Sequence, residues 1–79
     1  MIQIRLNGEP YRVPSGETIE GLLQILALRA DQVAVEHNLD IVDRGDFATR
    51  VLQEGDQVEI LSFIGGGTSV GERGDENIM

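Results

Sequence analysis

Three consecutive glycines, Gly65–Gly67, are the residues whose type and spacing best fit a chemical role in this chain. They follow an alternating, strand-like run over 58–64, near the end of the 79-residue chain. Because glycine has no Cβ, three of them can extend about 10 Å from a folded body and enter a narrow active site. This suits a carboxyl terminus presented to another enzyme. Residues 68–79 follow, however, so Gly67 carries a peptide bond and not a free carboxylate.

The rest of the chain offers little catalytic chemistry. There is no cysteine, which excludes disulfides, thiolate metal ligands and a cysteine nucleophile. His37 is the only histidine, and we predict that it is a surface residue at the end of a strand. Asp40, Asp43 and Asp46 lack the spacing of a calcium loop and predict a solvated loop, not a metal site. The residues therefore predict a protein that is not an enzyme and binds no cofactor of its own.

Size and charge narrow the function further. A chain of 79 residues is long enough for one domain, and its small interior favours a binding or carrier role. The net charge of −8 disfavours nucleic acid and favours a basic protein partner. No apolar run is long enough to cross a membrane, and residues 1–6 do not resemble a signal peptide, so we expect a cytoplasmic protein.

Two strands and a helix are predicted in the first half of the chain. Apolar residues alternate over 2–6, and Asn7-Gly8 predicts a tight hairpin turn before a second strand at 11–13. Thr18 is a good N-cap for a helix over about 18–28. The apolar residues of this helix fall at i, i+3, i+4 and i+7, which gives it one apolar face: Ile19, Leu22, Leu23 and Leu26.

The second half predicts further strands and an irregular segment. Residues 33–36 predict a strand, residues 41–42 a possible short one, and residues 57–63 the last strand. Within the irregular segment 43–52, a single helical turn is expected to anchor three apolar residues in the core: Phe47, Val51 and Leu52.

This order of elements predicts an α+β protein. Pairing the first and last strands in parallel, with the helix over one face, buries all the apolar stripes together. The expected fold is a β-grasp (ubiquitin-like) domain over 1–64, with a mixed sheet of four to five strands and one main helix. Residues 65–67 are expected to form a flexible tail and residues 68–79 a disordered extension, because 65–79 contain five glycines and few large apolar residues: Val70, Ile78 and Met79.

The last strand also suggests a docking surface. If Val58 and Ile60 point toward the helix, alternation places Leu61 and Phe63 on the opposite face of the sheet. Two apolar residues that face away from the core suggest contact with a partner. We therefore predict Leu61 and Phe63 as partner-docking residues.

An ordered set of short motifs over about residues 2–67 resembles the ThiS family of ubiquitin-like sulfur carriers, within the ThiS/MoaD superfamily. The motifs are Asn7-Gly8-Glu9, Leu22-Leu23, Val33–Glu36 with Asn38, Gly55-Asp56 before Val58–Ile60, and Phe63–Gly67. The chain departs from the family at 68–79, because such carriers usually end at the glycines.

The resemblance implies a mechanism and a set of partners. An E1-like, ThiF-type adenylyltransferase would use ATP to adenylate the carboxylate of Gly67, while Gly65 and Gly66 thread the partner's active site. A persulfide from a cysteine desulfurase system would supply sulfur, giving a thiocarboxylate that a ThiG-type thiazole synthase uses in thiamine biosynthesis. Since an internal amide has no carboxylate to adenylate, we expect a maturing peptidase to remove 68–79.

Two alternatives stay open at this point. The chain could carry sulfur for another pathway, such as molybdopterin or amino-acid biosynthesis. It could also be a β-grasp interaction module whose glycine run is an ordinary linker and is never activated.

Overall fold

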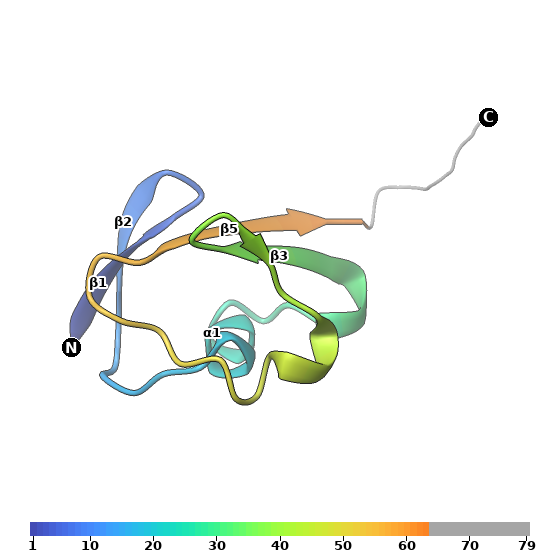
Figure 1. Cartoon of the computed structure of the whole chain (residues 1–79), viewed down its shortest axis with the longest axis horizontal. Helices are drawn as coiled ribbons and strands as arrows, with labels where there is room; N and C mark the ends of the chain where they lie inside the picture. The colour runs from blue at the N-terminus through green and yellow to red at the C-terminus, as the bar shows by residue number, and fades with distance from the viewer. Residues whose placement is uncertain (64–79) are drawn as a thin grey trace.

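The structure is a computed structural model that describes residues 1–63 of the chain (Figure 1). Its elements occur in the order β1 (Ile2–Leu6), β2 (Glu9–Val13), α1 (Ile19–Ile25), the 3-10 turn η1 (Ala30–Gln32), β3 (Val33–His37), β4 (Asp40–Ile41), the 3-10 turn η2 (Arg44–Asp46) and β5 (Gln57–Ser62). The predicted strands are all present, with ends that differ by one or two residues. Within residues 1–63, no helix is long and apolar enough to cross a membrane.

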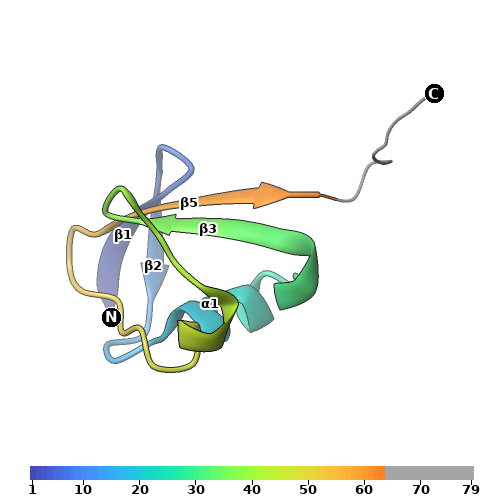
Figure 2. The same cartoon turned by 45° about the vertical axis from the view of Figure 1, so that its right-hand side comes forward.

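The five strands form one mixed sheet in the order β2-β1-β5-β3-β4. β1 and β5 run parallel, and every other neighbouring pair is antiparallel. Figures 1 and 2 show α1 lying across one face of this sheet, while no helix of residues 1–63 covers the other face. The predicted β-grasp arrangement, with the first and last strands parallel, is therefore confirmed.

Local sequence signals explain the hairpin and the start of the helix. Asn7 and Gly8 both have positive φ angles, 50° and 84°, as the tight turn between β1 and β2 requires. Thr18 caps α1 as predicted, because its Oγ1 accepts the N–H of Gly21 at 3.1 Å.

The helix is shorter than the predicted 18–28. Ala27 adopts a positive φ of 59°, which ends the helix in a Schellman-type cap. In this cap the N–H of Leu28 bonds the Leu23 carbonyl at 2.9 Å. The apolar periodicity continued past this point and gave no sign of the cap, since Ala is a poor residue for a left-handed position.

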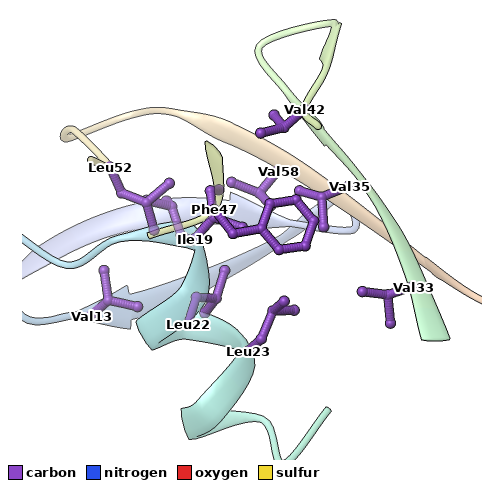
Figure 3. Packing of buried hydrophobic residues seen from close by; sticks show 11 residues of the cluster. Val13, Ile19, Leu22, Leu23, Val33, Val35, Val42, Phe47, Leu52 and Val58 are labelled. Atoms are coloured by element: carbon purple, nitrogen blue, oxygen red, sulfur yellow. The ribbon is translucent and has the colours of Figure 1, made fainter. Parts of the chain in front are cut away.

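The core lies between α1 and the sheet (Figure 3). Its buried apolar residues come from β1, β2, α1, β3 and β5 and from the loops on either side of η2: Ile4, Val13, Ile19, Leu22, Leu23, Val33, Val35, Val42, Phe47, Leu52 and Val58. Phe47 and Leu52 are core residues as predicted. The prediction for Val51 is wrong, because its side chain is 43% exposed and its backbone bridges to Thr18.

Candidate functional site

The strand β5 leads from the centre of the sheet toward the segment that carries the glycines. It begins beside β1, continues along β3 and ends at Ser62, three positions before Gly65 in the sequence (Figures 1 and 2). The predicted tail residues Gly65, Gly66 and Gly67 and the extension 68–79 lie outside the described residues. The structure therefore describes the strand that presents the tail, but not the tail.

The predicted alternation along β5 is confirmed. Val58 is completely buried, and Ile60 is half-buried against the core. Leu61 and Phe63 are 67% and 59% exposed. The two residues predicted to dock a partner are therefore accessible for docking.

Two further apolar residues, absent from the predicted docking set, lie near Leu61. Leu39 and Ile41 are 85% and 76% exposed, in the turn after β3 and in β4. Together with Leu61 they line an open groove of about 650 Å³ that also contains Glu36 and Glu59. We call this groove and the adjacent Phe63 the outer face. Leu39 and Ile41 were missed because Leu39 was assigned to a turn and the segment 41–42 is too short to show which side chain faces the core.

Asn7 lies at one side of this groove and contacts β5 through its side chain. Its Oδ1 accepts the N–H of Ile60 at 2.7 Å, and its Nδ2 donates to the carbonyl of Ile60 at 3.3 Å. The side-chain amide of Asn7 thus occupies the place of a strand peptide, just where β1 turns away. Asn7 was predicted only as a turn residue, and no local pattern indicated its contact with β5.

A polar network holds the other end of β5. Asp56 lies just before the strand and is only 9% exposed. Its carboxylate interacts with His37 Nε2 at 2.6 Å, and it accepts hydrogen bonds from Asn38 Nδ2 at 3.1 Å and the Gln53 N–H at 2.8 Å. These contacts tie the turn before β5 to the end of β3.

The prediction that His37 is a surface residue is wrong, because it is only 6% exposed. Arg50 donates from Nε to His37 Nδ1 at 2.9 Å, so the ring hydrogen is on Nε2 and is donated to Asp56. Both ring nitrogens are thereby used in holding the fold. The alternation of Val33, Val35 and His37 on the inward face of β3 was the signal that could have identified this position.

The two carboxylates of the network, Asp40 and Asp56, differ in burial. Arg50 also reaches Asp40 at 3.3 Å, but that carboxylate is exposed. For Asp56, burial by itself acts to raise the pKa of the carboxyl group. The hydrogen bonds from its three neighbours favour the charged form and leave the pKa of Asp56 below its ordinary value. The network is built around an ionised Asp56.

Nothing in this arrangement resembles a metal centre. Within the part of the chain that the structure describes, no three His, Asp or Glu side chains gather closely enough to hold an ion. Asp40 is paired with Arg50 instead. What the described residues offer is an exposed apolar surface beside a strand that leads to a glycine tail.

The ThiS family model matches residues 4–67, which run from β1 through the last of the three glycines. The chain belongs to the ThiS family. The sulfur carrier protein ThiS of Escherichia coli K12 is 33% identical over 66 residues, which cover 84% of this chain and 100% of that protein. The crystal structure of the thiamine biosynthesis protein ThiS from Geobacter metallireducens matches with a TM-score of 0.72 and 33% identity, over 84% of this chain and all of that one.

A thiazole synthase of Magnetococcus marinus also contains a ThiS-like region. It is 50% identical over 66 residues, which cover 84% of this chain and 20% of that protein. The chain therefore spans about a fifth of the length of this relative. The ThiS match stops at Gly67, so residues 68–79 lie outside the part of the chain that defines the family.

Proposed function

We propose that this chain is the sulfur carrier for thiazole formation in thiamine biosynthesis, and that it carries sulfur as a thiocarboxylate on Gly67. The observation that carries the proposal is the ThiS family match, which runs through the β-grasp domain and ends at Gly67. The structure supports it by placing an exposed apolar face on the strand that leads to this residue.

The chemistry needs a free carboxylate at Gly67. A carboxylate oxygen attacks the α-phosphorus of ATP, releasing pyrophosphate and forming an acyl-adenylate. The outer sulfur of a partner's cysteine persulfide then displaces AMP, and a second thiol cleaves the sulfur–sulfur bond to leave the thiocarboxylate. Because an internal amide has no carboxylate oxygen to offer, residues 68–79 are removed by a peptidase before activation.

In this proposal the chain supplies the acyl group but no catalytic residue. ATP is bound by a ThiF-type, E1-like adenylyltransferase, and sulfur comes from a cysteine desulfurase system. A ThiG-type thiazole synthase accepts the sulfur, in the cytoplasm. The similarity to a longer protein named thiazole synthase supports this last partner.

The outer face is the proposed docking surface for these enzymes. Leu61 and Phe63 provide the exposed apolar contacts nearest the tail, and Leu39 and Ile41 extend them across the groove. Glu36 and Glu59 line the same groove and favour a partner with basic residues at this position. Docking here would leave Gly65 and Gly66 to extend into the partner's active site.

A reconstitution tests the proposal with three forms of the chain. One form ends at Gly67, one ends at Gly67 as a carboxamide, and one is full length. The shortened form keeps every core residue, and the matched region corresponds to the whole of the Geobacter ThiS structure, so it contains a complete domain.

Each form is incubated with ATP and the ThiF-type enzyme of the source organism, and intact mass is measured. We expect adenylation only of the form with a free Gly67 carboxylate. With a persulfide donor, this form should then gain the mass of one oxygen-to-sulfur exchange. Adenylation of the full-length chain would overturn the cleavage step. Absence of adenylate on all three forms would overturn the carrier function.

Transfer to the acceptor tests the pathway. We expect the ThiG-type synthase of the same organism to consume the thiocarboxylate form and return the carboxylate form. Sulfur transfer to a molybdopterin-type or amino-acid-forming acceptor, with none to the thiazole synthase, would assign the carrier to another pathway.

A further inference from the structure

The backbone of β5 has two edges, and its hydrogen bonds show which residues serve each edge. Odd-numbered residues face β3: the Gln57 carbonyl accepts the N–H of Asn38, and the Phe63 N–H donates to Gln32, both at 2.8 Å. Even-numbered residues face β1: the carbonyls of Asp56 and Val58 accept from Arg5 and Asn7 at 2.9 and 2.8 Å. Ser62 therefore directs its N–H and carbonyl away from β3, toward the side of β1.

On that side, β1 ends before it reaches Ser62. Its last register position is Leu6 opposite Val58, after which the chain turns at Asn7-Gly8. The Asn7 amide bonds the N–H and carbonyl of Ile60 and extends the ladder by one further position. Figures 1 and 2 show β5 continuing past the β1–β2 hairpin beyond this point.

Ser62 is the next position along this edge, and it is exposed. Among residues 1–63, no hydrogen bond to its N–H or carbonyl comes from the β1 side. A strand edge with unpaired backbone groups is a template for an added strand. The edge at Ser62 adjoins the outer-face groove, which Asn7, Glu59 and Leu61 all line.

We infer that this edge receives an extended segment of the activating enzyme, which pairs with the backbone of Ser62 at the exposed end of β5. The inference rests on the proposed carrier function and adds to it the mode of recognition. The segment donates to and accepts from the Ser62 backbone, and we expect basic residues in the part of the partner that contacts the groove lined by Glu36 and Glu59.

Charge favours this occupant over the two others that the chain itself could supply. A second copy carries the same net charge of −8 and would bring its own acidic residues to this edge. The segment 68–79 contains Glu72, Asp75 and Glu76 against one basic residue, Arg73, and would lie close to Glu59. A basic segment of the partner would be attracted to Glu59, whereas a second copy of the chain and residues 68–79 would each be repelled by it.

Asn7 then sets the register of the added strand. Because its amide already bonds Ile60, the partner's segment cannot pair further back along β5 than Ser62. A slip of two residues would displace the tail by about 7 Å relative to the partner's active site, given the rise of a strand. The Asn7 amide thus fixes how far Gly67 extends into the activating enzyme.

Two substitutions at one position test the edge. In the chain ending at Gly67, Ser62→Pro and Ser62→Ala both remove the hydroxyl, but only Ser62→Pro removes the N–H. Neither variant removes a hydrogen bond that the Ser62 N–H or hydroxyl makes within residues 1–63, and proline is tolerated at the edge of a sheet. Affinity for the ThiF-type enzyme is measured by calorimetry, and folding is checked by thermal denaturation.

We expect Ser62→Pro to bind about tenfold more weakly than Ser62→Ala, the effect of losing one interfacial hydrogen bond. Ser62→Ala should bind like the unsubstituted chain. Equal affinities for the two variants would overturn the inference. If Ser62→Pro proves unfolded, amide hydrogen exchange of the unsubstituted chain decides the question.

In the exchange experiment, the Ser62 N–H should exchange fast in the free chain and slow in the complex. The Phe63 N–H, which bonds Gln32, serves as the protected control in both states. Unchanged exchange at Ser62 on binding would overturn the inference. So would protection already present in the free full-length chain, or protection that grows with chain concentration, since these would assign the edge to 68–79 or to a second copy.

The unsubstituted chain separates this inference from the proposed function. If it is adenylated while both Ser62 variants bind equally, the carrier function stands and strand pairing fails. If it neither binds nor is adenylated, both fail.

Discussion

The two ends of β5 differ in almost every physical property, although they belong to one strand of six residues. At its start, Asp56 and Val58 are buried and their carbonyls bond β1. At its end, Leu61 and Ser62 are exposed, and one backbone edge is without a bond from residues 1–63. The fold fixes one end of the strand and leaves the other open to a partner.

This difference shows how a very small domain can combine a firmly held strand start with an exposed strand end. The buried start of β5 is held by the core and by the polar network around Asp56, so the direction of the strand is set. At the other end, Leu61 and Ser62 pair with β3 and lie beyond the register with β1.

The largest difference in stability should come from shortening one side chain at each end of β5 to alanine. Val58→Ala removes two buried methyl groups beneath α1 and should destabilise the domain by about 2–3 kcal/mol. Leu61→Ala, three residues later, should change stability by less than about 0.5 kcal/mol, because Leu61 is 67% exposed. Urea denaturation of both variants measures the difference. Similar losses at the two positions would show that the outer face is part of the core.

Asp56→Asn should be the next largest change. The carboxylate uses both oxygens to accept from His37, Asn38 and Gln53, whereas an asparagine side chain has one acceptor oxygen and a competing donor. Leaving buried donors without acceptors should cost about 2 kcal/mol of stability. Asp40→Asn is the matched control, since Asp40 is exposed and its pairing with Arg50 should be worth less than about 1 kcal/mol. Equal losses of stability in the two variants would show that the contacts of Asp56 contribute no more than the exposed pair of Asp40 and Arg50.

Phe63→Ser tests the open end of the strand without disturbing the fixed end. Phe63 is 59% exposed, so its replacement should leave the thermal midpoint nearly unchanged. If it is a docking residue, affinity for the activating enzyme should fall about tenfold, as for an aromatic side chain at an interface. Ile25→Ser on α1, also exposed at 49%, is the control and should leave binding unchanged. A large loss of stability with Phe63→Ser would place this side chain in the core instead.

The layout of the domain could be predicted because its determinants are local and repetitive. Alternation in β1 and β5, the Asn7-Gly8 turn and the Thr18 cap are each read from neighbouring residues, and only one arrangement buries all the apolar stripes. The exposure of Leu61 and Phe63 followed from the same period of two. These parts of the prediction agree with the structure.

The errors occurred where a long-range contact decides the outcome. His37 was predicted on the surface because polar residues usually are, but Asp56, nineteen positions away, provides a buried partner. Asn7 was assigned only to its turn, because its contact with Ile60 spans 53 positions. Val51 was predicted in the core from its apolar side chain, but its backbone bridges to Thr18 and its side chain is exposed.

The smallest predicted effect is the pH dependence of stability, which depends on Asp56 at the buried end of β5. The folded-state pKa of Asp56 is lowered, so the ionised carboxylate stabilises the fold above the unfolded-state value of about 3.8. That contribution is lost as the pH falls from this value through the lowered folded-state pKa. Asp56→Asn has no such group to protonate.

The stability difference between the unsubstituted chain and Asp56→Asn should therefore be constant well above pH 3.8 and should shrink below it. Urea denaturation of both chains across this range measures the difference, and the other carboxylates cancel because both chains contain them. A difference that grows as the pH falls would require a raised pKa for Asp56. The charge at the start of β5 would then be a cost that the hydrogen bonds fail to offset, and the network would be held by a protonated carboxyl group.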